Sequence, residues 1–201
     1  SGAVSTVERF QNHGGAWRIP KSKRVIHNAQ EVPNQAMTPR EVLIHSSNIC
    51  AAQIGMRLGA ARMRALWQGL GVNEASGLGV FDIDRGRFPA AAEWNKPNAG
   101  PWTVASTSYG HQFSLTPLRL ATAYSALLNG GTLLEPRWFL DQPVRPVRRV
   151  FTASVAAQVT GWLEEAVRLR KDKVMPRWDD LRWGGKSGTV DKTHTAGYTV
   201  L

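Results

Sequence analysis

Residues 38–59, "TPREVLIHSSNICAAQIGMRLG", contain two helix starts separated by a short polar break. Thr38 is a good N-cap, Pro39 suits the first helical position, and Glu41 completes a capping box. The pattern predicts a short helix that runs up to His45.

A second helix is predicted to begin around Ser47 and to carry Ile49, Ile54 and Leu58 inward. A third is predicted over residues 60–70, before a long irregular connection over residues 71–104 that is rich in Gly, Pro and Asn. A loop of that length inside one domain is uncommon unless it has a function.

Two further helices are predicted later in the chain. In "SLTPLRLATAYSALLNGG", Thr116 is the N-cap and the Asn129-Gly130-Gly131 run is the stop. The apolar residues predicted to face inward from this helix are Leu120, Ala121, Tyr124, Leu127 and Leu128. Those of the next helix, over about 152–170, are Val155, Val159, Trp162, Leu163 and Val167.

Short strands are predicted at both ends of the chain. "AWRI" and "RVIHN" fall in the loop-rich opening third, and "RWGGKSGTV" and "AGYTVL" flank the turn "DKTHT" near the end. Helices followed by a terminal hairpin indicate an α+β fold.

The composition excludes several classes of protein. With 42% hydrophobic and 20% charged residues, the 201-residue chain is long and apolar enough to bury a core as one domain. A zinc site is not expected, because the histidines are scattered and Cys50 is the single cysteine. The net charge of +10 fits nucleic acid, an anionic membrane, an acidic polymer or simply a solvated basic surface. No nucleic-acid motif accompanies it, so nucleic-acid binding is not expected.

Two short polar segments are candidate sites. In "HSSN", one of the serines is expected to cap the second helix. The functional alternative has Ser46 relaying a proton and Asn48 holding a substrate amide. In "KSGT", residues 186–189, the plain interpretation is a Gly-rich loop with Lys186 in water.

As a strand, "KSGT" predicts a binding edge. Lys186 would bring positive charge, and Ser187 and Thr189 would offer hydroxyls to a carboxylate. Gly188 would allow close backbone approach, and the Thr189 N–H would stabilise an oxyanion. Such an edge also suits pairing with an extended peptide.

Together the two segments resemble two of the three motifs of the penicillin-recognising serine acyltransferases. Ser46-x-Asn48 matches the Ser-x-Asn motif, and Lys186-Ser187-Gly188 matches Lys-Ser/Thr-Gly. The text of residues 38–59 and of residues 107–138 is similar to the transpeptidase domain of class B penicillin-binding proteins, nearest to the septal type. The resemblance implies the penicillin-binding-protein/β-lactamase-like fold, an antiparallel sheet with helices on both faces.

The third motif of that family, Ser-x-x-Lys, does not occur in this chain, because no Lys has Ser three residues before it. Residues 1–201 are therefore expected to be part of a transpeptidase domain that is incomplete at both ends. The nucleophile helix is expected upstream, and the last strands and C-terminal helix downstream. The resemblance also implies an N-terminal membrane helix outside this chain, with this domain in the periplasm or outer wall space.

The family's chemistry implies a role for each matching residue. Ser46 and Lys186 would be catalytic, together with Asn48, which would bind the donor stem peptide. Ser187, Gly188 and Thr189 would bind its terminal carboxylate. The implied partners are peptidoglycan stem peptides and β-lactams, with divisome or elongasome membrane proteins beside them, and no metal or cofactor is expected.

Two other functions stay open on the sequence. A β-lactamase or β-lactam sensor has the same fold, but water rather than an amine resolves its acyl-enzyme. A non-catalytic wall-binding or scaffold protein would lack Ser-x-x-Lys even in its full-length gene.

Overall fold

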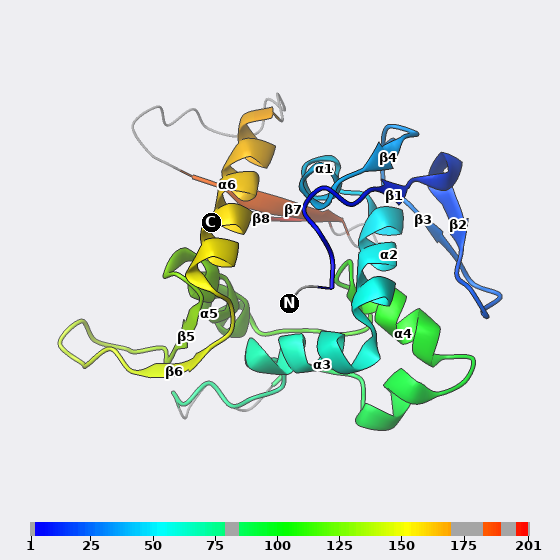
Figure 1. The fold of residues 1–201 in the computed structure, drawn as a ribbon. Helices are drawn as coiled ribbons and strands as arrows, with labels where there is room; N and C mark the ends of the chain where they lie inside the picture. Colours follow the sequence, from blue (N-terminus) through cyan, green and yellow to red (C-terminus); the bar gives the residue numbers. More distant parts are fainter. Residues whose placement is uncertain (1–2, 79–84, 170–182, 190–195, 201) are drawn as a thin grey trace.

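The computed structural model describes residues 3–78, 85–169, 183–189 and 196–200. Figure 1 shows the arrangement of its elements. The α-helices are α1 Pro39–His45, α2 Asn48–Leu58, α3 Ala60–Gly69, α4 Gly100–Thr107, α5 Pro117–Leu128 and α6 Ala153–Leu169. Two 3₁₀ helices are η1 His13–Gly15 and η2 Ala91–Asn95.

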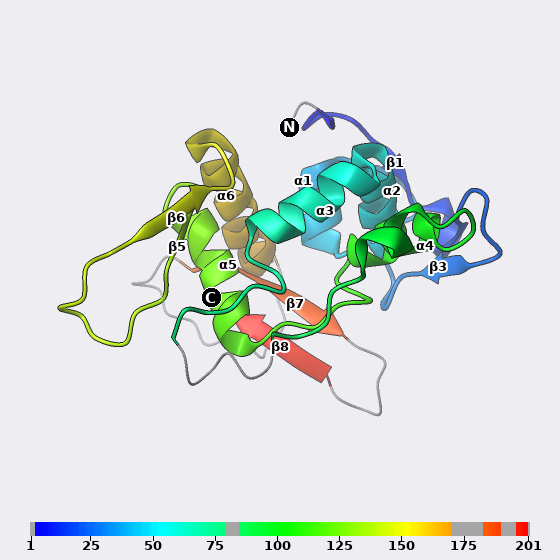
Figure 2. The same ribbon diagram turned by 90° about the horizontal axis from the view of Figure 1, so that it is seen from below.

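The strands of the described residues form four antiparallel pairs. They are β1 Phe10–Gln11 with β4 Ala36–Met37, β2 Ala16–Arg18 with β3 Val25–His27, β5 Thr132–Leu134 with β6 Pro146–Arg149, and β7 Gly185–Thr189 with β8 Ala196–Val200. Figure 2 shows the β2–β3 and β5–β6 pairs at opposite ends of the molecule. The predicted α+β class and the strands at both ends are confirmed.

The break between α1 and α2 forms as the sequence predicts. The backbone N–H of Thr38 donates to Glu41 Oε2 at 2.8 Å, and the Glu41 N–H donates back to the Thr38 hydroxyl. The Thr38 hydroxyl also lies 2.9 Å from Glu41 Oε2, and the hydrogen bonds that the Thr38 N–H and hydroxyl donate to this carboxylate hold the pKa of Glu41 below its ordinary value. Ser47 then caps α2 by accepting from the Cys50 N–H at 3.2 Å. The chain thus ends one helix and begins the next within two residues.

The centre of the fold is the packing of α2 against α4. Ile49, Ala52 and Ala105 are fully buried in one apolar cluster. At Gly55 the two helices are so close that a Cβ would lie 1.7 Å from the Ser108 hydroxyl oxygen. Small residues on both helices therefore set the distance between them.

The prediction of a long irregular connection over residues 71–104 is wrong for its second half, which contains η2 and the first half of α4. In α4 the hydroxyls of Ser106 and Thr107 each donate to a backbone carbonyl one turn earlier, at 2.7 Å. These bonds satisfy small polar side chains inside the core. The sequence of α4 therefore lacks the apolar periodicity that identifies a buried helix.

The helix α5 begins and ends where predicted, but its predicted inward face is only partly correct: Leu120, Tyr124 and Leu127 are half-buried, and the other two residues are not. Leu128 is 61% exposed and Ala121 is also exposed. The buried side chains are Arg119, Thr122 and Ala126. Arg119 reaches the core because its guanidinium donates to the backbone carbonyls of Glu74, at 3.3 Å, and Ala75, at 2.6 Å.

The helix α6 packs between α1 and the start of β7. Leu163 and Val167 are buried as predicted, whereas Val155 is 37% exposed. On one side α6 is tied to α1, because the Arg40 guanidinium donates to the Glu165 carboxylate in a two-point ion pair. On the other side the chain leading into β7 lies against the helix backbone at Gly184, where a Cβ would lie 2.7 Å from the Glu164 nitrogen.

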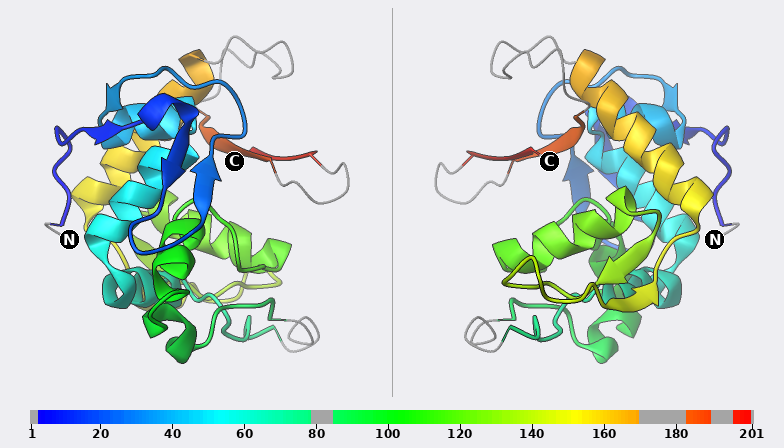
Figure 3. Two further views of the ribbon diagram at one scale, coloured as in Figure 1. Left: turned by 90° about the vertical axis from the view of Figure 1, so that its right-hand side faces the viewer. Right: turned by 90° about the vertical axis from the view of Figure 1, so that its left-hand side faces the viewer.

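The predicted terminal hairpin is confirmed. Its register places Gly185 opposite Val200 and Ser187 opposite Tyr198. Figure 3 shows β7 and β8 extending from α6 as a two-stranded ribbon. The predicted turn "DKTHT" lies outside the described residues. Within the part of the chain that the structure describes, no helix is long and apolar enough to cross a membrane.

Candidate active site

The two candidate segments meet in space. The Lys186 ammonium donates to the Ser46 hydroxyl oxygen at 2.6 Å, although the residues are 140 positions apart in the chain. It also donates to the backbone carbonyl of Ser187 at 2.8 Å. Both Lys186 and Ser46 are half-buried. Figure 1 shows how this happens, since β7 crosses from α6 toward the start of α2.

The backbone of Ser46 is unusual for a residue with a side chain. It has φ 58° and ψ 43°, in the left-handed region, at the C-cap of α1. Its N–H donates to the Val42 carbonyl, which closes the helix. The left-handed turn separates Ser46 from both helices and leaves its hydroxyl in reach of Lys186.

The neighbouring serine has a structural role. Ser47 is 2% exposed, and its hydroxyl lies 3.1 Å from Asn12 Oδ1 and 3.2 Å from Asn28 Oδ1. A hydroxyl has one proton, so it donates to one of these oxygens at a time. The Asn28 amide also donates to Asn12 Oδ1 at 2.9 Å. Ser47 is thus part of a buried amide network that fixes the start of α2.

Asn12 and Asn28 were not identified from the sequence as part of the site. Each directly follows a short strand, Asn12 after β1 and Asn28 after β3. Asn28 also accepts from the Ile49 N–H at 3.3 Å. The sequence does show a polar residue at the end of each of these strands. It does not show that the two residues lie beside Ser47 in the fold.

Asn48 is the first residue of α2 and is half-buried. Its side-chain amide donates to the His27 carbonyl at 3.1 Å. This bond ties the end of β3 to the candidate site and orients the Asn48 side chain.

The strand β7 presents a small, open face. Gly185 is buried, Ser187 is half-buried, and Gly188 is exposed. A Cβ placed on Gly188 would meet nothing within 4 Å. Thr189 ends β7 opposite Ala196, and its side chain lies outside the described residues. The strand therefore leaves room for a ligand beside Gly188.

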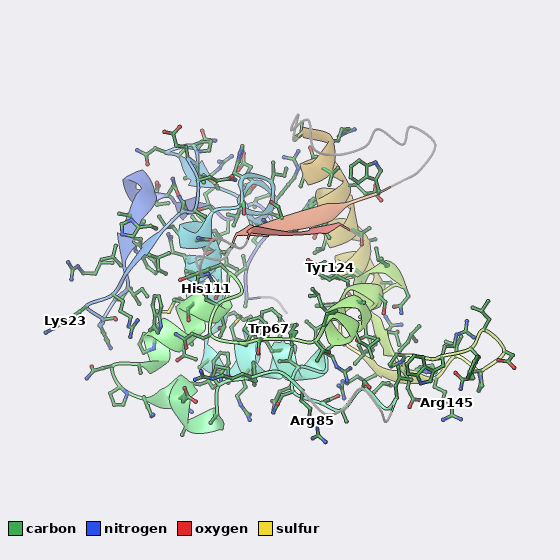
Figure 4. The ribbon with its side chains drawn as sticks, turned by 180° about the vertical axis from the view of Figure 1, so that it is seen from behind. Lys23, Trp67, Arg85, His111, Tyr124 and Arg145 are labelled. Atoms are coloured by element: carbon green, nitrogen blue, oxygen red, sulfur yellow. The ribbon has the colours of Figure 1, made fainter. Side chains whose placement is uncertain are left out.

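Two nearby groups have no reactive environment. The Cys50 thiol is fully buried, and burial raises its pKa. Burial also raises the pKa of Tyr109 to about 12, and this side chain packs against the Ile49 cluster. Its ring lies 4.9 Å from that of His111, which Figure 4 labels. These contacts give Tyr109 a structural role in the core.

No group of three or more His, Cys, Asp or Glu side chains suited to a metal ion occurs among the described residues. The chemistry available at the site is that of a lysine, a serine and an asparagine on rigid elements. A Lys–Ser pair in hydrogen-bond contact is suited to moving a proton, and the adjacent amide to binding a peptide.

Comparisons with known proteins agree with this geometry. A curated relative is the probable peptidoglycan D,D-transpeptidase FtsI of Caulobacter vibrioides, which is 33% identical over 164 residues, or 76% of this chain and 25% of the relative. Peptidoglycan D,D-transpeptidase FtsI of Escherichia coli is 25% identical over 169 residues, or 83% of this chain and 28% of that protein. The chain therefore spans about a quarter of the length of these relatives.

Solved structures are similar in fold. The apo structure of the TP domain from Burkholderia pseudomallei penicillin-binding protein 3 matches with a TM-score of 0.78 and 26% identity, over 98% of this chain and 57% of that one. A peptidoglycan glycosyltransferase from Burkholderia ambifaria matches with a TM-score of 0.76 and 24% identity, over 92% of this chain and 57% of that one.

The family model described as "Penicillin binding protein transpeptidase domain" matches residues 1–200, which is almost the whole chain. The chain therefore belongs to the penicillin-binding protein transpeptidase domain family.

Proposed function

We propose that this chain is part of a peptidoglycan D,D-transpeptidase that cross-links stem peptides through a serine acyl-enzyme and is inhibited by β-lactams. The observation that carries the proposal is the 2.6 Å hydrogen bond from Lys186 Nζ to Ser46 Oγ. It joins two motif residues from distant parts of the chain into one proton-transfer pair. The names of the curated relatives support the substrate class.

The nucleophile would come from a Ser-x-x-Lys helix upstream of residue 1 in a longer protein, with further strands and a closing helix downstream of residue 201. Its serine oxygen would attack the carbonyl carbon of the penultimate D-Ala. The peptide C–N bond breaks, the departing D-Ala amine takes up a proton, and an ester to the serine is left. An amine of a second stem peptide then attacks the ester, forms the new amide and returns the proton to the serine.

In this mechanism Ser46 relays the proton to the leaving amine, and Lys186 keeps the Ser46 hydroxyl oriented and the site positive. The Asn48 amide binds the backbone of the donor peptide. Ser187 and Thr189 hold its terminal carboxylate, and Gly188 leaves room for the extended peptide beside β7. The Thr189 N–H is one of two oxyanion donors, and the nucleophile's own N–H is the other.

The parent protein would be held in the bacterial cytoplasmic membrane with this domain on the periplasmic or outer wall side. Membrane proteins of the division or elongation machinery would be its neighbours. The names of the relatives, peptidoglycan D,D-transpeptidases, support a cell-wall role.

The test is acylation of the full-length protein by a labelled penicillin, followed over time. A transpeptidase forms a long-lived adduct on one serine and cross-links stem peptides. Rapid release of hydrolysed drug would instead identify a β-lactamase. A stable adduct without cross-linking would identify a sensor, and a full-length gene without Ser-x-x-Lys would identify a scaffold protein.

A further inference from the structure

The β2–β3 hairpin carries a concentration of positive charge that the proposed chemistry does not use. Arg18, Lys21, Lys23 and Arg24 are all exposed on this hairpin and its turn. The sequence contains no Asp or Glu between Glu8 and Glu31. These four side chains therefore have no local counter-charge.

The part of the chain that the structure describes brings no distant acidic partner into an ion pair with Arg18, Lys21 or Lys23 either. Among the described residues, the ion pairs of the chain involve arginines elsewhere, and none includes Arg18, Lys21 or Lys23. Arg24 lies over the Trp102 ring, 4.7 Å from its centroid, which anchors the hairpin to α4. Three exposed cations are thus held on an anchored element.

The alternation of side chains along the hairpin separates an inner from an outer face. Ile19 and Ile26 are buried and pack in the cluster around Ile49. Arg18 is exposed on the opposite face, paired in register with Val25. Lys21, in the turn, has a left-handed backbone with φ 59°. Figure 4 shows Lys23 at the outer end of the hairpin, pointing away from the rest of the molecule.

The hairpin is continuous with the candidate active site. Its second strand ends at His27, whose carbonyl accepts from the Asn48 amide at 3.1 Å. Lys23 lies four residues before His27, in the bend that leads into β3, so the chain between them spans at most roughly 14 Å. An extended peptide bound beside Asn48 covers the same distance in about four residues.

We propose that the β2–β3 hairpin is an outer binding surface for the carboxylate-bearing part of the peptide substrate, beyond the site at Ser46, Asn48 and Lys186. The positive charge of the hairpin is complementary to a ligand that carries carboxylates. The hydrogen bond from Asn48 to His27 connects the hairpin to the candidate active site, so a ligand bound at Asn48 could extend along the hairpin. This inference rests on the proposed function. It adds a substrate subsite made by Arg18, Lys21 and Lys23.

The test compares two triple variants of the full-length protein with equal loss of charge. The first is Arg18→Gln/Lys21→Gln/Lys23→Gln. The control, Arg62→Gln/Arg87→Gln/Lys96→Gln, removes three exposed cations from other elements. The probe is a fluorescent acidic peptide that ends in D-Ala-D-Ala, beside the same peptide with its side-chain carboxylates amidated. Binding is measured by anisotropy from low to physiological salt.

The hairpin variant is expected to bind the acidic peptide roughly tenfold more weakly at low salt, because three exposed charge pairs are lost. Added salt is expected to narrow that difference. The amidated peptide and the control variant are expected to show little change. A charge-conserving variant, Arg18→Lys/Lys21→Arg/Lys23→Arg, is expected to retain binding, which separates charge from folding.

Equal weakening in both triple variants, or no weakening in either, would overturn the inference. So would a hairpin variant that binds the acidic peptide normally but no longer binds vesicles of phosphatidylglycerol, since lipid headgroups would then be the ligand. Acylation by penicillin is the separate control, because a small β-lactam does not reach the hairpin. Failure of wild-type acylation would count against the proposed function instead.

Discussion

Two adjacent serines in this chain have opposite roles, and their environments explain why. Ser46 is half-buried in a left-handed turn and accepts from Lys186. Ser47 is 2% exposed, and its hydroxyl lies in hydrogen-bond contact with the Asn12 side chain and the Cys50 N–H. A hydroxyl held by a lysine is available for proton transfer, whereas one between buried amides is a structural cap.

Replacing Ser46 with Ala is expected to lower acylation of the full-length protein by penicillin roughly 10²- to 10⁴-fold, the usual value of a positioned proton relay. Stability should fall by no more than about 1 kcal/mol, because the Ser46 hydroxyl takes part in one half-buried hydrogen bond, from Lys186. The measurement is the second-order acylation rate constant, beside the melting temperature. A variant that acylates at the wild-type rate would remove Ser46 from the mechanism.

Replacing Ser47 with Ala is expected to give the reverse result. The free energy of unfolding should fall by about 1–2 kcal/mol, because α2 loses its cap and the buried Asn12 and Asn28 oxygens lose a donor. Urea unfolding of the same protein measures it. Unchanged stability would contradict the structural role given to the buried amide network.

At the scale of the elements, α6 positions the two halves of the candidate site. It is joined to α1 by the Arg40–Glu165 ion pair and to the start of β7 at Gly184. Contacts with α6 therefore hold both the Ser46 end of α1 and the Lys186 end of β7 in place. Loosening either contact should separate the motifs without touching a catalytic group.

Gly184 and Gly188 give a matched pair of substitutions. Gly184→Ala is expected to destabilise the protein by about 1–3 kcal/mol, because its Cβ would lie 2.7 Å from the α6 backbone. Gly188→Ala should change stability by less than about 0.5 kcal/mol, because its Cβ meets nothing within 4 Å. Unfolding curves of the two variants check this, and equal effects would contradict the described approach of β7 to α6.

The Arg40–Glu165 pair predicts a pH dependence. The hydrogen bonds from Arg40 hold the pKa of Glu165 below its ordinary value, and they raise the pKa of Arg40. A carboxyl with a lowered folded pKa stabilises the protein above its unfolded pKa of about 4.3. That contribution is lost as the pH falls through the lower, folded value.

The wild type is therefore expected to be more stable than Glu165→Gln at pH 7, with a difference that shrinks toward pH 3. Urea unfolding at both pH values measures it. The double variant Arg40→Gln/Glu165→Gln completes a thermodynamic cycle that isolates the pair. A difference that does not change with pH would show that the carboxylate charge is not responsible.

At the scale of the whole molecule, the chain supplies two motifs of a three-motif site. It contains no Ser-x-x-Lys, so the proposed nucleophile lies outside it. The apolar residues of α5 that were predicted to face inward include the exposed Ala121 and Leu128. The chain matches about a quarter of the length of its curated relatives, and under the proposed function a longer protein would supply the rest of the site.

The 201-residue chain alone is expected to form no covalent adduct with penicillin, because it contains no Ser-x-x-Lys motif to supply the acylated serine of the proposed mechanism. Intact-mass spectrometry after incubation with a large excess of drug measures this. The full-length protein is the positive control. A mass increase of one drug molecule on the 201-residue chain would identify a nucleophile within it.

The sequence by itself determined the boundaries of the capped helices α1, α2 and α5, the terminal hairpin and the two motifs, but not α4. Caps, turns and alternation act between neighbouring residues, so Thr38, Glu41 and Thr116 identified helix starts that the structure confirms. Only the tertiary structure decided the rest. It placed the Lys186 ammonium in contact with the Ser46 hydroxyl, buried Arg119 instead of Leu128, and brought Asn12 and Asn28 to the start of α2. These outcomes depend on partners far away in the chain, and a local pattern contains no information about which distant groups will satisfy a buried polar atom.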